Sequence, residues 1–378
     1  MPLYLTDDQA LLQDSARSFM ASEAPIPHFR KFRDMNCKDG FSHGLWKQFG
    51  EMGFTGILVP EAEGGLGLGH VEAGIVLEEI GRNLSPSPFL TTAIAGVTAL
   101  NAADKALRDR WLPGILAGET VLGLAIDEGA KHRPHAIATQ AERSGNGFRL
   151  TGKKQFVVQG ASADMLIVAA RTAGSPGDAE GLTLFAVPKD SANMTLEAAR
   201  LVDSAMGAHV RIDGVEVDGD AVIGEVDGGW AVLTRLLDAA RAGAAAELVG
   251  VGAGAMDMTI GYLKQRKQFG QLIGEFQALQ HRAAHLYAEM EVARAAVLKA
   301  QQLLDEGSDK AELMVAVAKA KAGQATSLAV KEGVQMHGGI GMTDEYDVGL
   351  FMKRDRALQE FFGDSNFQAD RVARMHGY

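Results

Sequence analysis

The chain has a single cysteine, Cys37, among its 378 residues. An internal disulfide and a cysteine metal cluster are therefore excluded. One free thiol is typical of the reducing cytoplasm, where we expect this protein. The ten histidines are scattered, and none forms the HExxH pair of a helical zinc site, so we expect no metal.

Basic charge and long apolar runs are also scarce. The net charge is −11, so the basic face that a nucleic-acid partner requires is not expected. The amino terminus, MPLYLTDDQA, lacks the basic and apolar regions of a secretory signal. The longest small and apolar run, residues 236–256, is interrupted by Asp238, Arg241 and Glu247, which argues against a membrane span.

What is present is an ordinary globular composition, 47% hydrophobic and 22% charged. A chain of this length predicts two or three packed units. Helical patterns dominate residues 1–120, where Thr6 to Gln9 has the form of a capping box. The expected helices of this first domain cover residues 44–52, 70–81 and 102–117.

The pattern changes near Val121 and again after Gly229. Between them lie short apolar runs separated by turn residues, which predict a small β-sheet or barrel domain over 121–229. The runs are GFRLTG (147–152), QFVVQG (155–160), MLIVAAR (165–171) and LTLFAVP (182–188). Residues 230–378 are helical again, with apolar residues at helical spacing over 230–265, 277–306, 310–337 and 365–375. The fold class is therefore α+β.

The most informative segment is YLKQRKQFGQLIGEFQALQHRAAHL, residues 262–286. A basic helix end, with Lys264, Arg266 and Lys267, leads into a glycine turn and a new amphipathic helix. A guanidinium beside free backbone amides suits a pyrophosphate. The residues alone leave a second interpretation open, in which this is a helix-turn-helix with a solvated basic end.

Four segments together resemble the acyl-CoA dehydrogenase family. Residues 262–286 are similar to its main signature, and VQMHGGIGMTDEY (334–346) resembles its second signature. VPEAEGGLGLGHVEAGIVLEEIGR (59–82) resembles its amino-terminal motif, and GKKQFVVQGASADMLIVAAR (152–171) the strand pair beneath the flavin. The resemblance implies an amino-terminal helical domain, a middle β domain and a carboxy-terminal four-helix bundle, with FAD as cofactor.

The resemblance also implies which residues bind the cofactor and the CoA. Seven residues match positions that contact FAD, either at the pyrophosphate or at the adenine half shared with a neighbouring subunit. They are Arg266, Gln268, Phe269, Gln277, Gln335, Gly338 and Gly339. Glycines there let the main chain approach the phosphate closely. Phe156 matches the aromatic beneath the flavin, and Val158 stands where a threonine is usual. Asp238 and Arg241, three residues apart on one helical face, match a pair that contacts CoA.

The family reaction implied is α,β-dehydrogenation of an acyl-CoA, in which a carboxylate removes the α-proton and hydride passes to the flavin. This chain departs from the pattern. Gly363, within FFGDS, occupies the usual position of the catalytic glutamate. Ala240 occupies the alternative position, immediately before the CoA-binding arginine. Residues 125–128, Ala-Ile-Asp-Glu, replace a Thr-Glu-Pro-Gly turn.

Two carboxylates are candidates for the missing base. Glu247 lies on nearly the same helical face as Ala240, about 10 Å further along the axis, and has apolar neighbours in sequence. Its other interpretation is a solvated or ion-paired helix residue. Asp364 adjoins Gly363, but it is better explained by capping, with Ser365 and Gln368 as a capping box. We therefore predict Glu247 as the base, if the chain supplies one.

A glycine at position 363 does not remove the family's oxyanion site. The resemblance implies that the backbone N–H at this position holds the thioester oxygen, together with a ribityl hydroxyl of the flavin. Gly363 keeps that N–H, and we expect the missing side chain to add pocket volume for a bulky, ring-bearing acyl group.

The altered motifs most resemble the small-subunit branch of bacterial α2β2 acyl-CoA dehydrogenases, which act on steroid side-chain, aromatic or dicarboxylic acyl groups. The first hypothesis is an acyl-CoA dehydrogenase, acting as a homotetramer or as half of a heterotetramer, with electron-transfer flavoprotein or a similar acceptor. The second is a catalytically silent subunit that clamps a partner's FAD. The third is a flavin oxidase or monooxygenase on the same scaffold.

Overall fold

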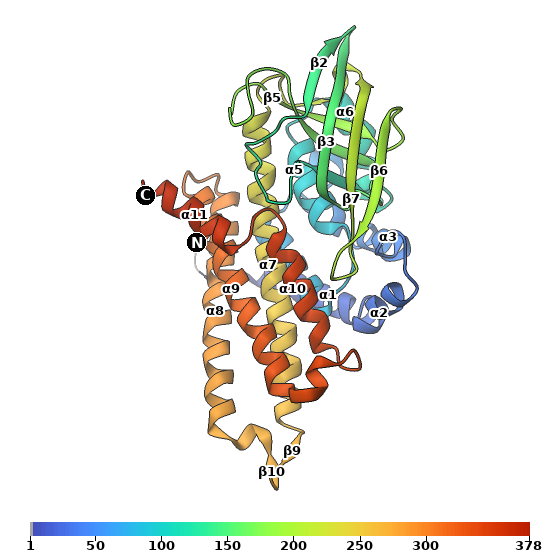
Figure 1. Ribbon diagram of the computed structural model, residues 1–378. Coiled ribbons are helices and arrows are strands. Elements are labelled where there is room, and N and C mark those ends of the chain that lie inside the picture. The colour runs from blue at the N-terminus through green and yellow to red at the C-terminus, as the bar shows by residue number, and fades with distance from the viewer. Residues whose placement is uncertain (1–2) are drawn as a thin grey trace. The chain divides into compact units, whose positions relative to one another are not determined.

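The computed structural model describes residues 3–378 and confirms the α+β class, with 55% helix and 16% strand. Figure 1 shows the elements in chain order. The helices are α1 (Asp7–Glu23), α2 (Ile26–Asp34), α3 (His43–Glu51), α4 (His70–Asn83), α5 (Val97–Leu100), α6 (Lys105–Leu116), α7 (Gly229–Leu263), α8 (Gln277–Asp305), α9 (Ala311–His337), α10 (Val348–Glu360) and α11 (Ser365–Met375). The strands are β1 (Leu122–Ala125), β2 (Gln140–Ser144), β3 (Gly147–Val158), β4 (Met165–Arg171), β5 (Leu182–Pro188), β6 (Met194–Arg200), β7 (Met206–Val217), β8 (Val222–Ile223), β9 (Lys267–Gln268) and β10 (Gln271–Leu272).

Most expected elements are confirmed near their expected bounds. The capping box of α1 forms, with Gln9 N donating to Thr6 Oγ1 at 3.3 Å and Thr6 N to Gln9 Oε1 at 3.0 Å. Strands β4 and β5 have the expected limits, whereas the two runs over 147–160 form one strand, β3. The elements that were not predicted include α2, α10 and the π-helical segment η3 (Leu90–Gly96).

Contacts between Cα atoms divide the chain into two compact units. One contains residues up to Lys31, 69–85 and 241–378, and the other contains residues 32–68 and 86–240. The predicted domain boundaries at residues 120 and 229 are not tested by this division and stay a prediction. Among residues 3–378, no helix combines the length and the apolar composition that crossing a membrane requires.

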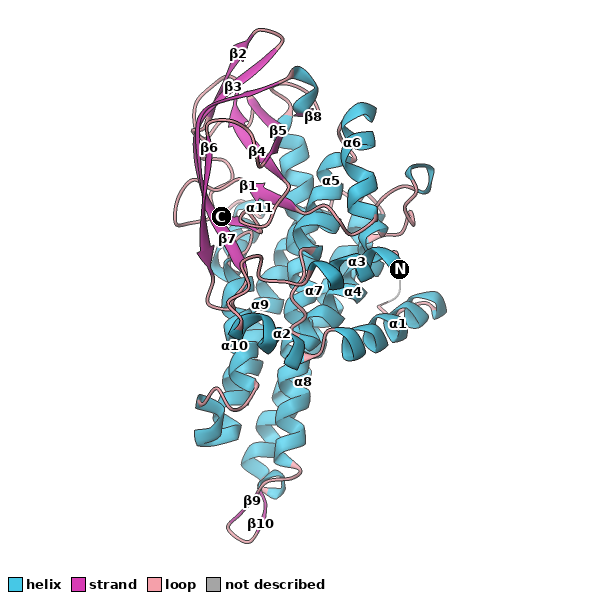
Figure 2. Ribbon diagram, turned by 90° about the vertical axis from the view of Figure 1, so that its right-hand side faces the viewer, coloured by secondary structure: helices cyan, strands magenta, loops and turns pink. Residues whose placement is uncertain are grey.

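The second unit is built around an eight-stranded sheet, shown with magenta strands in Figure 2. The strand order is β6-β7-β3-β1-β4-β5-β8, and β2 pairs with β3 and β4. Strands β1 and β4 are parallel, whereas β1 and β3 are antiparallel. The inner face carries a buried apolar cluster that includes Phe148, Val168 and Phe185, which explains why these short runs become strands.

The first unit is helical. The later part of α7, together with α8, α9 and α10, forms a bundle in which α8 packs along α9. Small residues on α7 allow close approach: a Cβ at Gly250 would lie 1.9 Å from the carbonyl oxygen of Glu78 on α4. Helix α11 packs on α9 as well. The turn that joins α10 to α11 is the part of this unit that carries position 363.

Candidate functional site

The turn between α10 and α11 has an unusual backbone. Helix α10 ends at Glu360, and Phe362 and Gly363 then adopt φ values of +61° and +97°. Asp364 follows as the N-cap of α11, and its side chain accepts from Phe367 N at 2.8 Å. Positive φ is uncommon outside glycine, so this turn is held in a shape that its sequence alone would not favour.

Side chains from two other positions hold the carbonyl groups of this turn. Arg241 on α7 donates from Nε to Phe362 O at 3.1 Å. Gln368 on α11 donates from Nε2 to Phe362 O at 3.0 Å and to Gly363 O at 3.3 Å. Both side chains are buried, so these bonds are shielded from water. The match of Arg241 to a CoA contact stays a prediction, and its observed partner is the turn itself.

The space beside Gly363 is filled by an aromatic ring. A Cβ built at this position would lie 2.2 Å from Cδ1 of Phe367 and 2.8 Å from Cε1. The guanidinium carbon of Arg241 lies 5.8 Å from the centroid of the same ring. The expectation that Gly363 adds pocket volume is therefore wrong, because Phe367 occupies the place where a side chain would extend.

Asp364 has the capping role that we favoured over a catalytic one, but the detail of the predicted capping box is wrong. Asp364 itself is the N-cap, and Ser365 is the first residue of α11. The Ser365 hydroxyl instead donates to Ala320 O on α9 at 3.2 Å. Gln368, expected to close the box, bonds to the carbonyls of the turn. The sequence could not show that Asp364 rather than Ser365 caps the helix, because the spacing of Ser365 and Gln368 also fits a capping box.

Glu247, the predicted base, is buried at 2% exposure and is ion-paired. Arg354 on α10 donates from Nε to Glu247 Oε1 at 2.8 Å, and its Nη2 atom contacts the same oxygen. The predicted burial and the apolar neighbours, such as Leu248 and Val249, are therefore present, but the structure adds an ion pair to them. The ion pair is the other interpretation given above, and a carboxylate held by a guanidinium is a poor proton acceptor.

The residues matched to the FAD pyrophosphate and adenine half lie at one end of the bundle. Arg266 precedes the β9–β10 hairpin, at the bottom of Figure 1, which carries Gln268 and Phe269. Phe269 is 92% exposed with φ +53°, and Gln277 begins α8. An almost fully exposed phenylalanine is unusual in a folded chain.

The second matched segment lies at the same end of the bundle. Gln335 is in the last turn of α9, followed by Gly338 and Gly339 in the 3-10 helix η6 (Gly338–Met342). Ring contacts join this segment to the end of α7: the His337 ring centroid lies 4.5 Å from Tyr262 and 4.7 Å from Tyr346. A Cβ built at either glycine meets nothing within 4 Å, so their main chain is open to approach.

The residues matched to the flavin ring lie on β3 in the sheet unit. The pairing of β3 with β7 shifts register between Lys154 and Val157, and Phe156 within this bulge has φ +53°. A bulge redirects the side chain it carries, which gives a physical reason for the special position of Phe156. Val158 pairs with Leu124 and offers no hydroxyl, so a side-chain bond to a flavin is absent at this position.

The turn that replaces the family's Thr-Glu-Pro-Gly is fixed by an ion pair that sequence reasoning missed. Lys154, whose side chain has no exposed surface, donates to Glu128 Oε1 at 2.7 Å and to Ile126 O at 3.1 Å. Glu128 also accepts from Ala138 N and Thr139 N at 2.8 and 2.9 Å. Burial alone would raise the pKa of Glu128, but Lys154 and the Thr139 hydrogen bonds outweigh it and lower that pKa.

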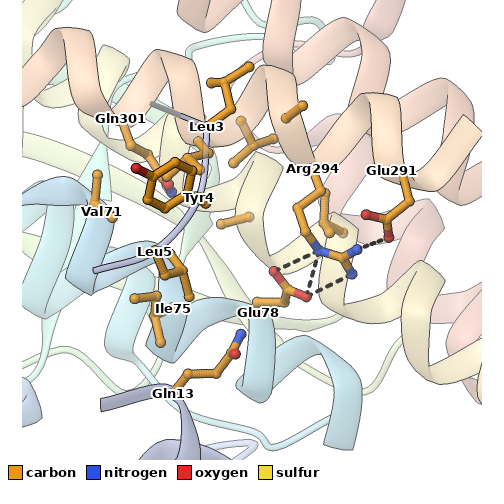
Figure 3. A pocket seen from close by; sticks show the side chains of 16 residues that line it. Leu3, Tyr4, Leu5, Gln13, Val71, Ile75, Glu78, Glu291, Arg294 and Gln301 are labelled. Carbon is orange, nitrogen blue, oxygen red and sulfur yellow. Dashed lines mark hydrogen bonds and ion pairs between the residues drawn. The ribbon is translucent and has the colours of Figure 1, made fainter. Parts of the chain in front are cut away.

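A separate hollow in the helical unit is lined by residues of the amino-terminal segment, α1, α4, α7 and α8 (Figure 3). Its volume is about 220 Å³, and its walls include Tyr4, Ile75 and Leu298. The charges at one end are already paired, since Arg294 bonds to Glu78 at 2.9 Å and also to Glu291. No residue of the α10–α11 turn lines it, so we assign it no role in the site.

Comparison with known proteins identifies the class that this fold and site define. The acyl-CoA dehydrogenase amino-terminal, middle and carboxy-terminal domain models match residues 6–119, 127–215 and 227–376. The chain is 31% identical over 357 residues to acyl-CoA dehydrogenase FadE12 of Mycobacterium tuberculosis, covering 93% of this chain and 91% of that protein. The chain therefore belongs to the acyl-CoA dehydrogenase family, flavoprotein oxidoreductases that act on CH–CH bonds of acyl-CoA.

Two further relatives bear on substrate and assembly. A solved structure described as the Tcur3481-Tcur3483 steroid ACAD superposes with a TM-score of 0.88 at 29% identity, covering 98% of each chain. The caffeyl-CoA reductase-Etf complex subunit CarC of Acetobacterium woodii is 27% identical over 380 residues and covers 99% of both chains.

Proposed function

We propose that the chain binds FAD and serves as one subunit of an acyl-CoA dehydrogenase whose catalytic base comes from a second family member. The observation that carries this proposal is the packing at Gly363. The ring of Phe367 occupies the space beside Gly363, the position that we match to the family's glutamate. Ala240 offers no carboxylate at the alternative position, and Glu247 is bound to Arg354.

The exposed end of the bundle supports FAD as the cofactor. The Arg266 guanidinium suits a pyrophosphate, and the exposed ring of Phe269 suits a stacked or edge contact with an aromatic base. Gly338 and Gly339 leave their main chain open, as a phosphate contact requires. When bound, FAD supplies the acceptor for the hydride that leaves the β-carbon.

This chain then contributes to the reaction by binding the acyl-CoA and by polarising its thioester carbonyl. The N–H of Gly363 makes only a long bond, 3.4 Å, to Glu360 O. A better acceptor can replace this contact, and the thioester oxygen of an acyl-CoA is such an acceptor as enolate charge develops. Asp238 and Arg241 remain the proposed CoA contacts. The α-proton goes to a carboxylate that the partner subunit provides.

The acyl group that we propose is bulky, a steroid side chain or an aryl acid, and the acceptor is an electron-transfer flavoprotein. The support comes from the relatives, one described as a steroid enzyme and one as a subunit of an Etf complex. Position 363 does not contribute to this choice, because Phe367 fills the volume there.

The test is to purify the chain alone and with a co-expressed second family member, such as the product of an adjacent gene. Flavin content is measured from the absorption spectrum, and short-chain, aryl and steroid-side-chain CoA thioesters are titrated for anaerobic bleaching. We expect bleaching only from the combined sample.

Fast bleaching by the chain alone would show that it carries its own base and would refute the proposal. Absence of flavin from both samples would refute FAD binding. Oxygen consumption without an added acceptor would favour the oxidase alternative instead.

A further inference from the structure

Lys319 on α9 is a fully buried ammonium that the reaction described above does not use. Its side chain has no exposed surface. Nζ donates to Leu358 O at 2.9 Å and lies 3.5 Å from Gln359 O. Among the described residues 3–378, no carboxylate forms an ion pair with it. Its direct hydrogen bonds go to main-chain carbonyls, and these offset the loss of hydration only in part.

The two carbonyls belong to the last turn of α10. The final carbonyls of a helix have no partner within the helix, and they carry the negative end of its dipole. An ammonium placed there donates hydrogen bonds to these carbonyls and also neutralises the negative end of the dipole. The capped turn leads directly into Phe361, Phe362 and Gly363, so Lys319 fixes the point from which the α10–α11 turn departs.

The remaining carbonyls of the turn are held in the same manner from other helices. Arg241 on α7 and Gln368 on α11 hold Phe362 O and Gly363 O, as described above. The Ser365 hydroxyl donates to Ala320 O, next to Lys319 on α9. The turn is therefore fixed on both sides of Gly363, and its peptide planes, including the Gly363 N–H, have a set direction.

The charges that face Lys319 come from three elements. Burial lowers its pKa most, to about 7. Asp355 and Glu360 on α10 and Asp364 at the start of α11 oppose this effect, whereas Arg241 on α7 adds to it. Asp355 is also engaged by Ser327 Oγ at 2.9 Å and Gln359 Nε2 at 3.1 Å.

We propose that Lys319 is a positioning residue for acyl-CoA: its ammonium anchors the end of α10, so that the N–H of Gly363 is presented to the thioester oxygen. This inference rests on the proposed function, in which that N–H polarises the substrate. Because Lys319 changes charge near neutral pH, the anchoring weakens as pH rises through about 7.

The experiment compares Lys319→Met with Lys321→Met. Lys321 lies two residues along the same helix, where its side chain is 26% exposed and paired with Glu289, so its variant is a matched control. The protein is the flavin-loaded complex. Amide hydrogen exchange is followed in peptides covering residues 356–366. Affinity is measured with one CoA thioester that perturbs the wild-type flavin spectrum.

We expect Lys319→Met to exchange faster over residues 356–366 and to bind the thioester about five- to tenfold more weakly at pH 6.5, because methionine has no donor to replace the charge-assisted hydrogen bond of the ammonium. Wild-type affinity should fall by a similar factor between pH 6 and 8.5, and the variant should show no such fall. Lys321→Met should match wild type throughout. Lys319→Met should also lose some global stability, because the carbonyls of Leu358 and Gln359 are left without this donor, although an apolar side chain suits the buried site.

Unchanged exchange in Lys319→Met, or unchanged affinity despite faster exchange, would overturn the inference. If the variant does not fold, the pH dependence of wild-type exchange, corrected for the intrinsic rate, decides instead, and a flat profile overturns it. A wild-type complex that holds no flavin or binds no thioester would refute the proposed function. The exchange measurement would still decide whether Lys319 anchors the turn.

Discussion

Replacing Gly363 with alanine tests the packing that defines the turn. Two effects oppose the substitution. A non-glycine residue in a sparsely populated conformation such as φ +97° costs about 1–3 kcal/mol. Overpacking against Phe367, whose Cδ1 would lie 2.2 Å from the new Cβ, adds about 1–3 kcal/mol. We therefore expect Gly363→Ala to lower the free energy of unfolding by about 2–6 kcal/mol.

Urea denaturation at matched protein concentration measures this change. Gly129→Ala is the control, because its Cβ would meet nothing within 4 Å and its φ is not positive, so its stability should stay within about 0.5 kcal/mol of wild type. A double-mutant cycle with Phe367→Ala separates the two effects. Removing the ring should relieve the clash but not the backbone strain, leaving a coupling of about 1 kcal/mol or more. A Gly363→Ala variant as stable as the Gly129→Ala control would refute the reasoning.

Three further predictions address the cofactor, the buried ion pair and pH. Arg266→Ala should lower FAD affinity by about one to two decades with little change in unfolding, since a charge-assisted phosphate contact contributes about 1.5–3 kcal/mol; full flavin after dialysis would contradict the assignment. Glu247→Gln should destabilise the fold by about 3–5 kcal/mol, because Arg354 is left without its charge partner; a variant of native stability with slow flavin reduction would instead support Glu247 as the base. Because the pKa of Glu128 is lower in the folded protein than its unfolded value of 4.5, this carboxylate stabilises the fold above pH 4.5, and the stabilisation is lost as pH falls through the folded pKa. Glu128→Gln should therefore flatten the acid limb of a plot of stability against pH. An unchanged acid limb would contradict the role of the ion pair between Glu128 and Lys154.

The sequence predicted the parts of the fold that local patterns determine. Strands β4 and β5 are continuous apolar runs between turn residues, and their bounds were read directly. Helix α10 was missed because its middle, residues 353–356, reads Lys-Arg-Asp-Arg, which hides the apolar positions Leu350, Phe351 and Leu358. The π-helical segment was missed because it follows two prolines, which indicate a loop.

The site was less predictable, because its decisive contacts join distant residues. An ion pair was one of the interpretations of Glu247, but its partner Arg354 lies 107 positions further along the chain and could not be identified from local sequence. Gly363 was identified from the sequence as the altered position, which stays a prediction, and nothing local showed that Phe367 would turn back over it. Lys319 has no motif of its own, and only the fold brings it to the end of α10.

The exposed hairpin at the end of the bundle has a practical consequence for handling the chain. Residues 264–270 are all exposed, and Lys264, Arg266 and Lys267 among them are sites for trypsin. Such accessible loop residues are preferred places for proteolytic nicking. A cut there separates α7 from α8 covalently. The rate of cleavage at these three sites therefore reports, without any spectroscopic signal, whether something covers Phe269.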